Sequence, residues 1–216
     1  MRQITLILIF LLTTFLCFGQ KEHLEPARDF KQYEGVLKEY YDNVFPLLYR
    51  GFSEKPYARY TSMPSFSAEY AFSVEKIGEK YYIIFNKLSA NFWYAGYDKK
   101  GNMDNKRRNS VKLNTIKTEI NNDLYLKIGE LFELLASQTK VYEKEWFGCD
   151  GVTYYFTTTD KNGEIQIGET WSPNKDTLLG RLVKICDKLC SIGNEKDISQ
   201  SKILEEIDKL INELKQ

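Results

Sequence analysis

The stretch AEYAFSVEKIGEKYYIIF, residues 68–85, decides the fold class of this chain. In its first half every second side chain is apolar, the pattern of a strand buried on one face: Ala68, Tyr70, Phe72 and Val74. Ile77-Gly78-Glu79 predicts a tight turn, and the apolar run Tyr81–Phe85 predicts a central strand. We therefore expect a β-hairpin, with Asn91–Tyr97 adding the third strand of an antiparallel meander.

A second hairpin is expected further along the chain. Its two strands carry alternating apolar residues at Val152, Tyr154 and Phe156 and then at Ile165, Ile167 and Trp171. Between them, Asp160-Lys161-Asn162-Gly163 has the residues of a type I turn closed by a left-handed glycine. The same segment does not fit a calcium loop, because its sixth position is Ile165 instead of glycine.

Apolar residues at helical spacing predict about four helices around these strands. They are expected over Arg28–Tyr49 with a kink or stop near Asp42–Phe45, just before Pro46, over Leu113–Leu135 with an interruption at Asn121-Asn122-Asp123, from Ser172-Pro173 to Gly193, and over 199–214. Gly51–Pro64 is expected to be a loop. The predicted fold class is α+β: an antiparallel sheet of about five strands, a three-stranded meander plus a hairpin, packed on one face against about four helices.

Residues 1–19 have the composition of a secretory signal peptide. A basic N-terminus and a short apolar run precede Gly19, and strongly polar residues follow it. The run is shorter than the roughly 20 apolar residues that a membrane-spanning helix needs. Leu16 is too large for the position before an acylated Cys17, which argues against a lipid anchor. We expect export to the periplasm or the extracellular space, no stable membrane insertion after cleavage, and a single domain over residues 20–216.

The charge balance bears on the class of partner. The chain has 30 basic and 30 acidic side chains, so it lacks the basic excess with which proteins bind nucleic acid. The local cluster Lys106-Arg107-Arg108 lies in a polar stretch and is interpreted as a solvated loop. With 15 Tyr, 13 Phe and 3 Trp, the chain has enough apolar surface for a packed core.

Three cysteines remain after the signal peptide, namely Cys149, Cys186 and Cys190. An oxidising compartment favours one disulfide and one free thiol. Cys186 and Cys190 are four residues apart on a predicted helix, where bridge geometry is poor, so a disulfide would join Cys149 to one of them. The other interpretation, three reduced cysteines that fill apolar space, is slightly favoured because disulfide-dependent domains usually hold an even number.

His23 is the only histidine, and it lies close to the expected mature N-terminus. Its position argues against a Ser-His-Asp triad, a Cys-His pair and a histidine-rich zinc site. No catalytic residue, metal site or cofactor is therefore predicted.

Aromatic residues in polar or turn-rich segments are the candidates for ligand contact. Trp93 and Tyr94 lie in an aromatic run, and Trp171 ends the second hairpin. Trp146 and Asp150 belong to the segment Glu145–Gly151, which precedes a strand. Such side chains can stack on sugar rings or anchor a protein partner. The alternative is that they are core residues and turn residues.

Two functions from different classes follow. The first is an exported, non-enzymatic binding protein whose ligand is a protein or a glycan. The second is a periplasmic or extracellular hydrolase that works with carboxylates and without histidine. The acidic residues in or beside the predicted strands are Glu69, Glu75, Glu145, Asp150 and Glu169. The lack of a catalytic motif favours the binding protein.

Overall fold

The computed structural model describes residues 23–98, 100–102, 104–141, 150–192 and 199–216. Three predictions fall outside these residues: the signal peptide over residues 1–19, the candidate Trp146 and the candidate Cys149. Each helix in the described part of the chain is too short or too polar to span a lipid bilayer.

The described strands form one antiparallel sheet of seven strands, in the order β1-β7-β6-β2-β3-β4-β5. The strands are β1 (Glu25–Pro26), β2 (Ala58–Pro64), β3 (Tyr70–Ile77), β4 (Lys80–Leu88), β5 (Leu113–Ile120), β6 (Val152–Thr159) and β7 (Ile165–Trp171). The helices are η1 (Phe30–Gln32), α2 (Gly35–Leu48), α3 (Phe92–Ala95), α4 (Asn105–Asn109), α5 (Asn122–Ser137), α6 (Leu178–Ser191) and α7 (Gln200–Leu214). The α+β class predicted from the sequence is confirmed.

Both predicted hairpins are present. β3 pairs with β4 from Tyr70 opposite Lys87 to Ile77 opposite Lys80, and Gly78 closes the turn with a φ of +61°. β6 pairs with β7, and the Asp160 carboxylate accepts the backbone N–H groups of Asn162 and Glu164 in the connecting turn. Glycine at the left-handed positions relieves the steric clash that a side chain would cause there.

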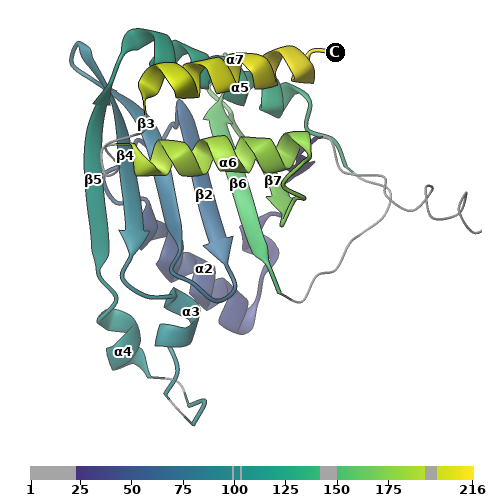
Figure 1. The fold of residues 1–216 in the computed structure, drawn as a ribbon. Coiled ribbons are helices and arrows are strands. Elements are labelled where there is room, and N and C mark those ends of the chain that lie inside the picture. Colours follow the sequence, from purple (N-terminus) through teal and green to yellow (C-terminus); the bar gives the residue numbers. More distant parts are fainter. Residues whose placement is uncertain (1–22, 99, 103, 142–149, 193–198) are drawn as a thin grey trace, which may run out of the picture.

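Helices cover both faces of the sheet, whereas the sequence predicted helices on one face only. Helices α5, α6 and α7 lie across one face, here called the first face, and α2 lies behind the sheet on the second face (Figure 1). Because side chains alternate along each strand, β2 contributes Tyr60 to the core under α6 and Met63 to the core under α2. The whole of β2 is buried as a result.

Two predicted segments had the wrong boundaries, because in each a strand directly adjoins a polar turn. The predicted loop Gly51–Pro64 contains β2, which pairs with β3 on one side and β6 on the other. The predicted helix Leu113–Leu135 is divided into β5 and α5. Asn121 lies at the division, where its side chain accepts the N–H of Leu124 and caps α5.

Two helix predictions also needed correction. The expected strand Asn91–Tyr97 is the short helix α3, whose first amide groups are bound by side chains of Asn91 and Glu69. The helix expected from Ser172-Pro173 begins at Leu178 instead, after Thr177, which accepts the N–H of Gly180. Ser172 still belongs to the β6–β7 pairing through its backbone and hydroxyl contacts with Val152.

Candidate functional site

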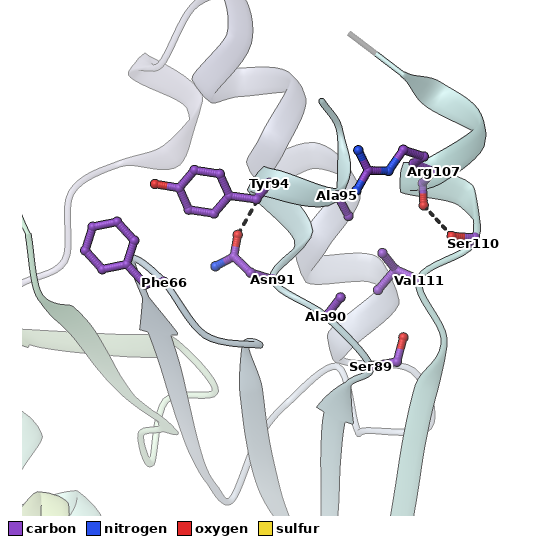
Figure 2. A pocket seen from close by; sticks show the side chains of 9 residues that line it. All are labelled: Phe66, Ser89, Ala90, Asn91, Tyr94, Ala95, Arg107, Ser110 and Val111. Atoms are coloured by element: carbon purple, nitrogen blue, oxygen red, sulfur yellow. Dashed lines mark hydrogen bonds between the residues drawn. The ribbon is translucent and has the colours of Figure 1, made fainter. Parts of the chain in front are cut away.

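An exposed pair of aromatic rings marks one end of the molecule. Phe66, in the loop after β2, stacks on Tyr94 of α3 with 6.1 Å between ring centroids and 15° between planes. The two side chains are 66% and 50% exposed. They border a surface hollow of about 310 Å³ whose other wall includes Arg107 (Figure 2). Large apolar groups in contact with water at the rim of a hollow are typical of a binding surface.

Asn91 joins the two parts of this aromatic pair. Its Oδ1 accepts the N–H of Tyr94 at 3.0 Å, which caps α3. Its Nδ2 donates to the carbonyls of Ser67 at 2.8 Å and Pro64 at 3.2 Å, on either side of Phe66. The amide thus ties the backbone of the Phe66 loop to the helix that carries Tyr94.

Glu69 anchors α3 from beneath. Its carboxylate is fully buried and accepts the Tyr40 hydroxyl at 2.7 Å and the N–H of Phe92 at 2.9 Å. Burial raises the pKa of Glu69, while the hydrogen bonds from Tyr40 and Phe92 act in the opposite direction. The residue is sealed from the hollow, so it supports the site without reaching a ligand.

The basic cluster of α4 has two different environments. Arg108 is only 7% exposed, lies over the Phe92 ring and forms an ion pair with Glu39, so the interpretation of this residue as solvated was wrong. Arg107 lines the hollow, and its Nη1 donates to the carbonyl of Tyr97 at 2.6 Å. Asp104 caps the helix by accepting the N–H of Arg107.

The floor of the hollow is made of small residues, namely Ser89, Ala90, Ala95, Ser110 and Val111. Ser89 accepts the N–H of Lys112, so its hydroxyl proton is available to another acceptor. Ser110 donates to the carbonyl of Arg107 and can still accept. The described residues that line the hollow include no carboxylate, thiol or imidazole, and their chemistry is that of stacking and hydrogen bonding.

The structure separates the predicted aromatic candidates. Tyr94 borders the hollow, but its neighbour Trp93 is partly buried and packs edge-on against Tyr40 at 5.4 Å. Trp171 is partly buried at the end of β7, close to Gly151. Asp150 is exposed beside Gly151, whose carbonyl accepts the N–H of Ser65. Trp171 and Asp150 therefore lie next to the Phe66 loop, although they do not line the hollow.

The two cysteines that the structure describes belong to the core of the first face. Cys186 and Cys190 are free, buried thiols of α6. Burial raises the pKa of both thiols well above the usual value, which keeps them protonated. A bond to Cys149 stays a prediction because that residue lies outside the described part of the chain.

Phe66, Asn91 and Arg107 are the site residues that the sequence analysis missed. Phe66 is a lone aromatic residue in the short polar segment Pro64-Ser65-Phe66-Ser67, and this isolation was the available signal. Among the described residues no three His, Cys, Asp or Glu side chains gather in a way that could hold a metal ion.

Fold and site together define an α+β protein with an aromatic surface hollow. Comparison of the chain with protein-family models, with curated proteins and with solved structures finds no match.

Proposed function

We propose that this chain is an exported, non-enzymatic binding protein that holds a glycan in the hollow beside Phe66 and Tyr94. The observation that carries the proposal is the stacked pair itself, two exposed rings that Asn91 holds in a defined arrangement. A sugar ring has an apolar face that packs on aromatic rings and hydroxyl groups that bind polar neighbours. Ser89, Ser110 and Arg107 supply such neighbours in the hollow.

The size of the hollow favours a small ligand over a folded protein. Its volume of about 310 Å³ is at the lower end of the range for small-molecule sites. A stable protein interface buries roughly 800 Å² on each partner, with a larger apolar centre than two rings provide. A glycan of one or two sugar units matches the hollow better.

Binding in the hollow is favoured over hydrolysis because two of the candidate carboxylates are used elsewhere. Glu69 is sealed beneath α3, and Glu75 accepts the N–H of Ser53 and the hydroxyl of Ser73. A glycoside hydrolase needs two carboxyl groups that flank the scissile bond. The described residues that line the hollow supply none.

The binding proposal is tested with a glycan library and two truncations. Phe66→Ala and Tyr94→Ala are each expected to weaken binding by about tenfold or more, as the loss of an aromatic anchor does. Leu126→Ala is the matched control, because Leu126 is 54% exposed on α5, far from the lining residues in sequence and fold. Glycan binding that survives both truncations, or that Leu126→Ala reduces equally, would overturn the proposal, and so would a library with no binder.

Export is tested separately by the mass of the protein recovered from its native host. We expect a mature chain that begins at Gln20 and carries no lipid, since cleavage after Gly19 removes Cys17. A chain that retains residues 1–19, or that begins with an acylated Cys17, would contradict this part of the proposal. The glycan measurement stands independently, because it uses residues of the folded part of the chain.

A further inference from the structure

Arg107 lines the hollow and has guanidinium donors that no described residue uses. Its Nη1 is held by the carbonyl of Tyr97, which fixes the orientation of the planar group. The opposite edge, formed by Nε and Nη2, makes no hydrogen bond with the described residues, and Figure 2 shows the side chain extending from α4 towards Ala95 of α3. Two parallel N–H groups are the geometry that binds a carboxylate or sulfate in a bidentate way.

The segment around Arg107 is positive in a chain that is neutral overall. Residues 98–112 contain six Lys or Arg and two Asp, while the whole chain has 30 basic and 30 acidic side chains. Asp98 accepts the backbone N–H groups of Lys100 and Asn102, and Asp104 accepts those at the start of α4. Both carboxylates thus accept hydrogen bonds within their own loops, and the hydrogen bonds from Asn102, followed by the charge of Arg107, contribute to the lowered pKa of Asp98.

Ser89 adds a donor in the floor of the hollow. Because its Oγ accepts the N–H of Lys112, its hydroxyl proton is free to bind another acceptor. An anionic group seated at Arg107 would accept from the guanidinium, while the sugar ring that carries it lies over Tyr94. The hollow therefore combines an apolar platform with one charged, oriented donor edge.

We infer that the ligand is an anionic sugar, whose carboxylate or sulfate group binds the Nε–Nη2 edge of Arg107 while its ring stacks on the Phe66–Tyr94 pair. This inference rests on the proposed glycan binding and names its substrate class. The charge of Arg107 distinguishes acidic glycans from neutral ones, and the aromatic pair binds both.

The test uses matched pairs of monosaccharides that differ only in the anionic group. The pairs are galactose and galacturonic acid, glucose and glucuronic acid, and N-acetylglucosamine and its 6-sulfate. The carboxylated and sulfated pairs show which of the two anions is preferred. For the wild-type protein we expect the acidic member of at least one pair to bind about tenfold more tightly, a factor consistent with a charge-assisted hydrogen-bonded pair. Calorimetric titration at fixed ionic strength measures each dissociation constant.

Arg107→Gln is expected to abolish this preference, because it weakens binding of the acidic member of a pair far more than binding of the neutral member. Lys106→Gln is the matched control, since Lys106 is an exposed neighbour on α4 that does not line the hollow. An unchanged melting temperature in both variants shows that the fold is intact. Arg107→Lys should keep only part of the preference, because a single ammonium group lacks the bidentate edge.

The outcomes separate this inference from the proposal beneath it. Equal affinity of the wild type for neutral and acidic members, with both lost on Tyr94→Ala, would overturn the inference and retain glycan binding. A preference that Lys106→Gln removes as fully as Arg107→Gln would also overturn it, since general charge would then be responsible. Failure of every sugar to bind would overturn both.

Discussion

The two faces of the sheet are stabilised in different ways. Under α5, α6 and α7, the first face has a large core of aliphatic and aromatic side chains, together with the Asp187 carboxylate of α6, which accepts the Tyr60 and Tyr70 hydroxyls. Under α2 and α3, the second face has a smaller core with buried polar or charged groups among aromatic rings: Arg59, Thr61, Glu69, Asn86 and Arg108. Apolar burial stabilises without direction, whereas buried polar groups need partners in defined positions.

The polar groups of the second face bind the ends of helices and the loops near them. Asn86 of β4 donates to the carbonyl of Leu48 at 2.7 Å and to that of Arg50 at 3.0 Å, where α2 ends. Glu69 accepts the first amide of α3 in the same manner. Helix termini leave backbone groups without intrahelical partners, so such side chains decide where each helix stops or starts. The first face supplies most of the stability, and the second face places α3 and therefore Tyr94.

Truncation of a large side chain on the first face should have the greatest effect on stability. Phe132 of α5 is 2% exposed and packs against Phe72 and Phe156 of the sheet. Phe132→Ala should lower the free energy of unfolding by about 3–5 kcal/mol, from lost burial and the cavity that remains. Urea denaturation measures the change. Leu126→Ala on the exposed side of the same helix is the control, and a loss for Phe132→Ala no larger than that of the control would contradict the assignment of the main core.

Removal of Glu69 tests whether the second face depends on its buried polar groups. Glu69→Ala leaves the Tyr40 hydroxyl and the Phe92 amide without an acceptor and should cost about 2 kcal/mol. Glu69→Gln keeps one acceptor oxygen and should cost less. The decisive readout is the glycan affinity, which Glu69→Ala should lower through the displacement of α3. If Glu69→Ala were as stable as wild type and bound equally well, the buried carboxylate would not position the site.

The pH dependence of stability isolates the charge of Glu69. Burial raises the pKa of this carboxyl in the folded protein above its ordinary value. The folded state then binds more protons than the unfolded state, so the contribution of Glu69 is fully present below the unfolded pKa and declines as pH rises through the folded pKa. Asp187, whose pKa burial also raises, has the same sign. The difference between wild type and Glu69→Gln removes the Asp187 contribution and should decline as pH increases; a difference that grows with pH would contradict the assignment.

The contrast between the faces also explains which parts of the fold could be predicted. The β3–β4 and β6–β7 hairpins follow from alternation and turn residues, which are local signals. The helices α6 and α7 follow from apolar spacing, because they pack mainly against apolar side chains. By contrast, the short helix α3 depends on Glu69, a residue more than twenty positions earlier in the chain. Its aromatic sequence favours a strand, and tertiary hydrogen bonds override that local preference.

The candidate site was predicted only in part for the same reason. Tyr94 could be named from its aromatic neighbourhood, but nothing in the sequence distinguishes it from Trp93, which packs against Tyr40. Phe66 comes from a loop and Arg107 from α4, and their place in one hollow depends on the long-range bonds of Asn91 and on the fold of α4. The spacing of residues along the chain predicts which side chains share a helix face, but it does not predict that residues from separate segments lie close together.

The smallest effect on stability is expected at the aromatic pair itself. Tyr94 is half exposed and its ring stacks on Phe66, which is itself exposed, so Tyr94→Ala should change the free energy of unfolding by about 0.5 kcal/mol or less. Calorimetric melting measures the change beside the titration of glycan. A side chain with little effect on stability and a large effect on binding has a functional role, whereas one that packs the core shows the reverse. Tyr94→Ala with a loss of stability near that of Phe132→Ala would show instead that the exposed pair is part of the core of the second face, and the hollow would lose its claim to be the binding site.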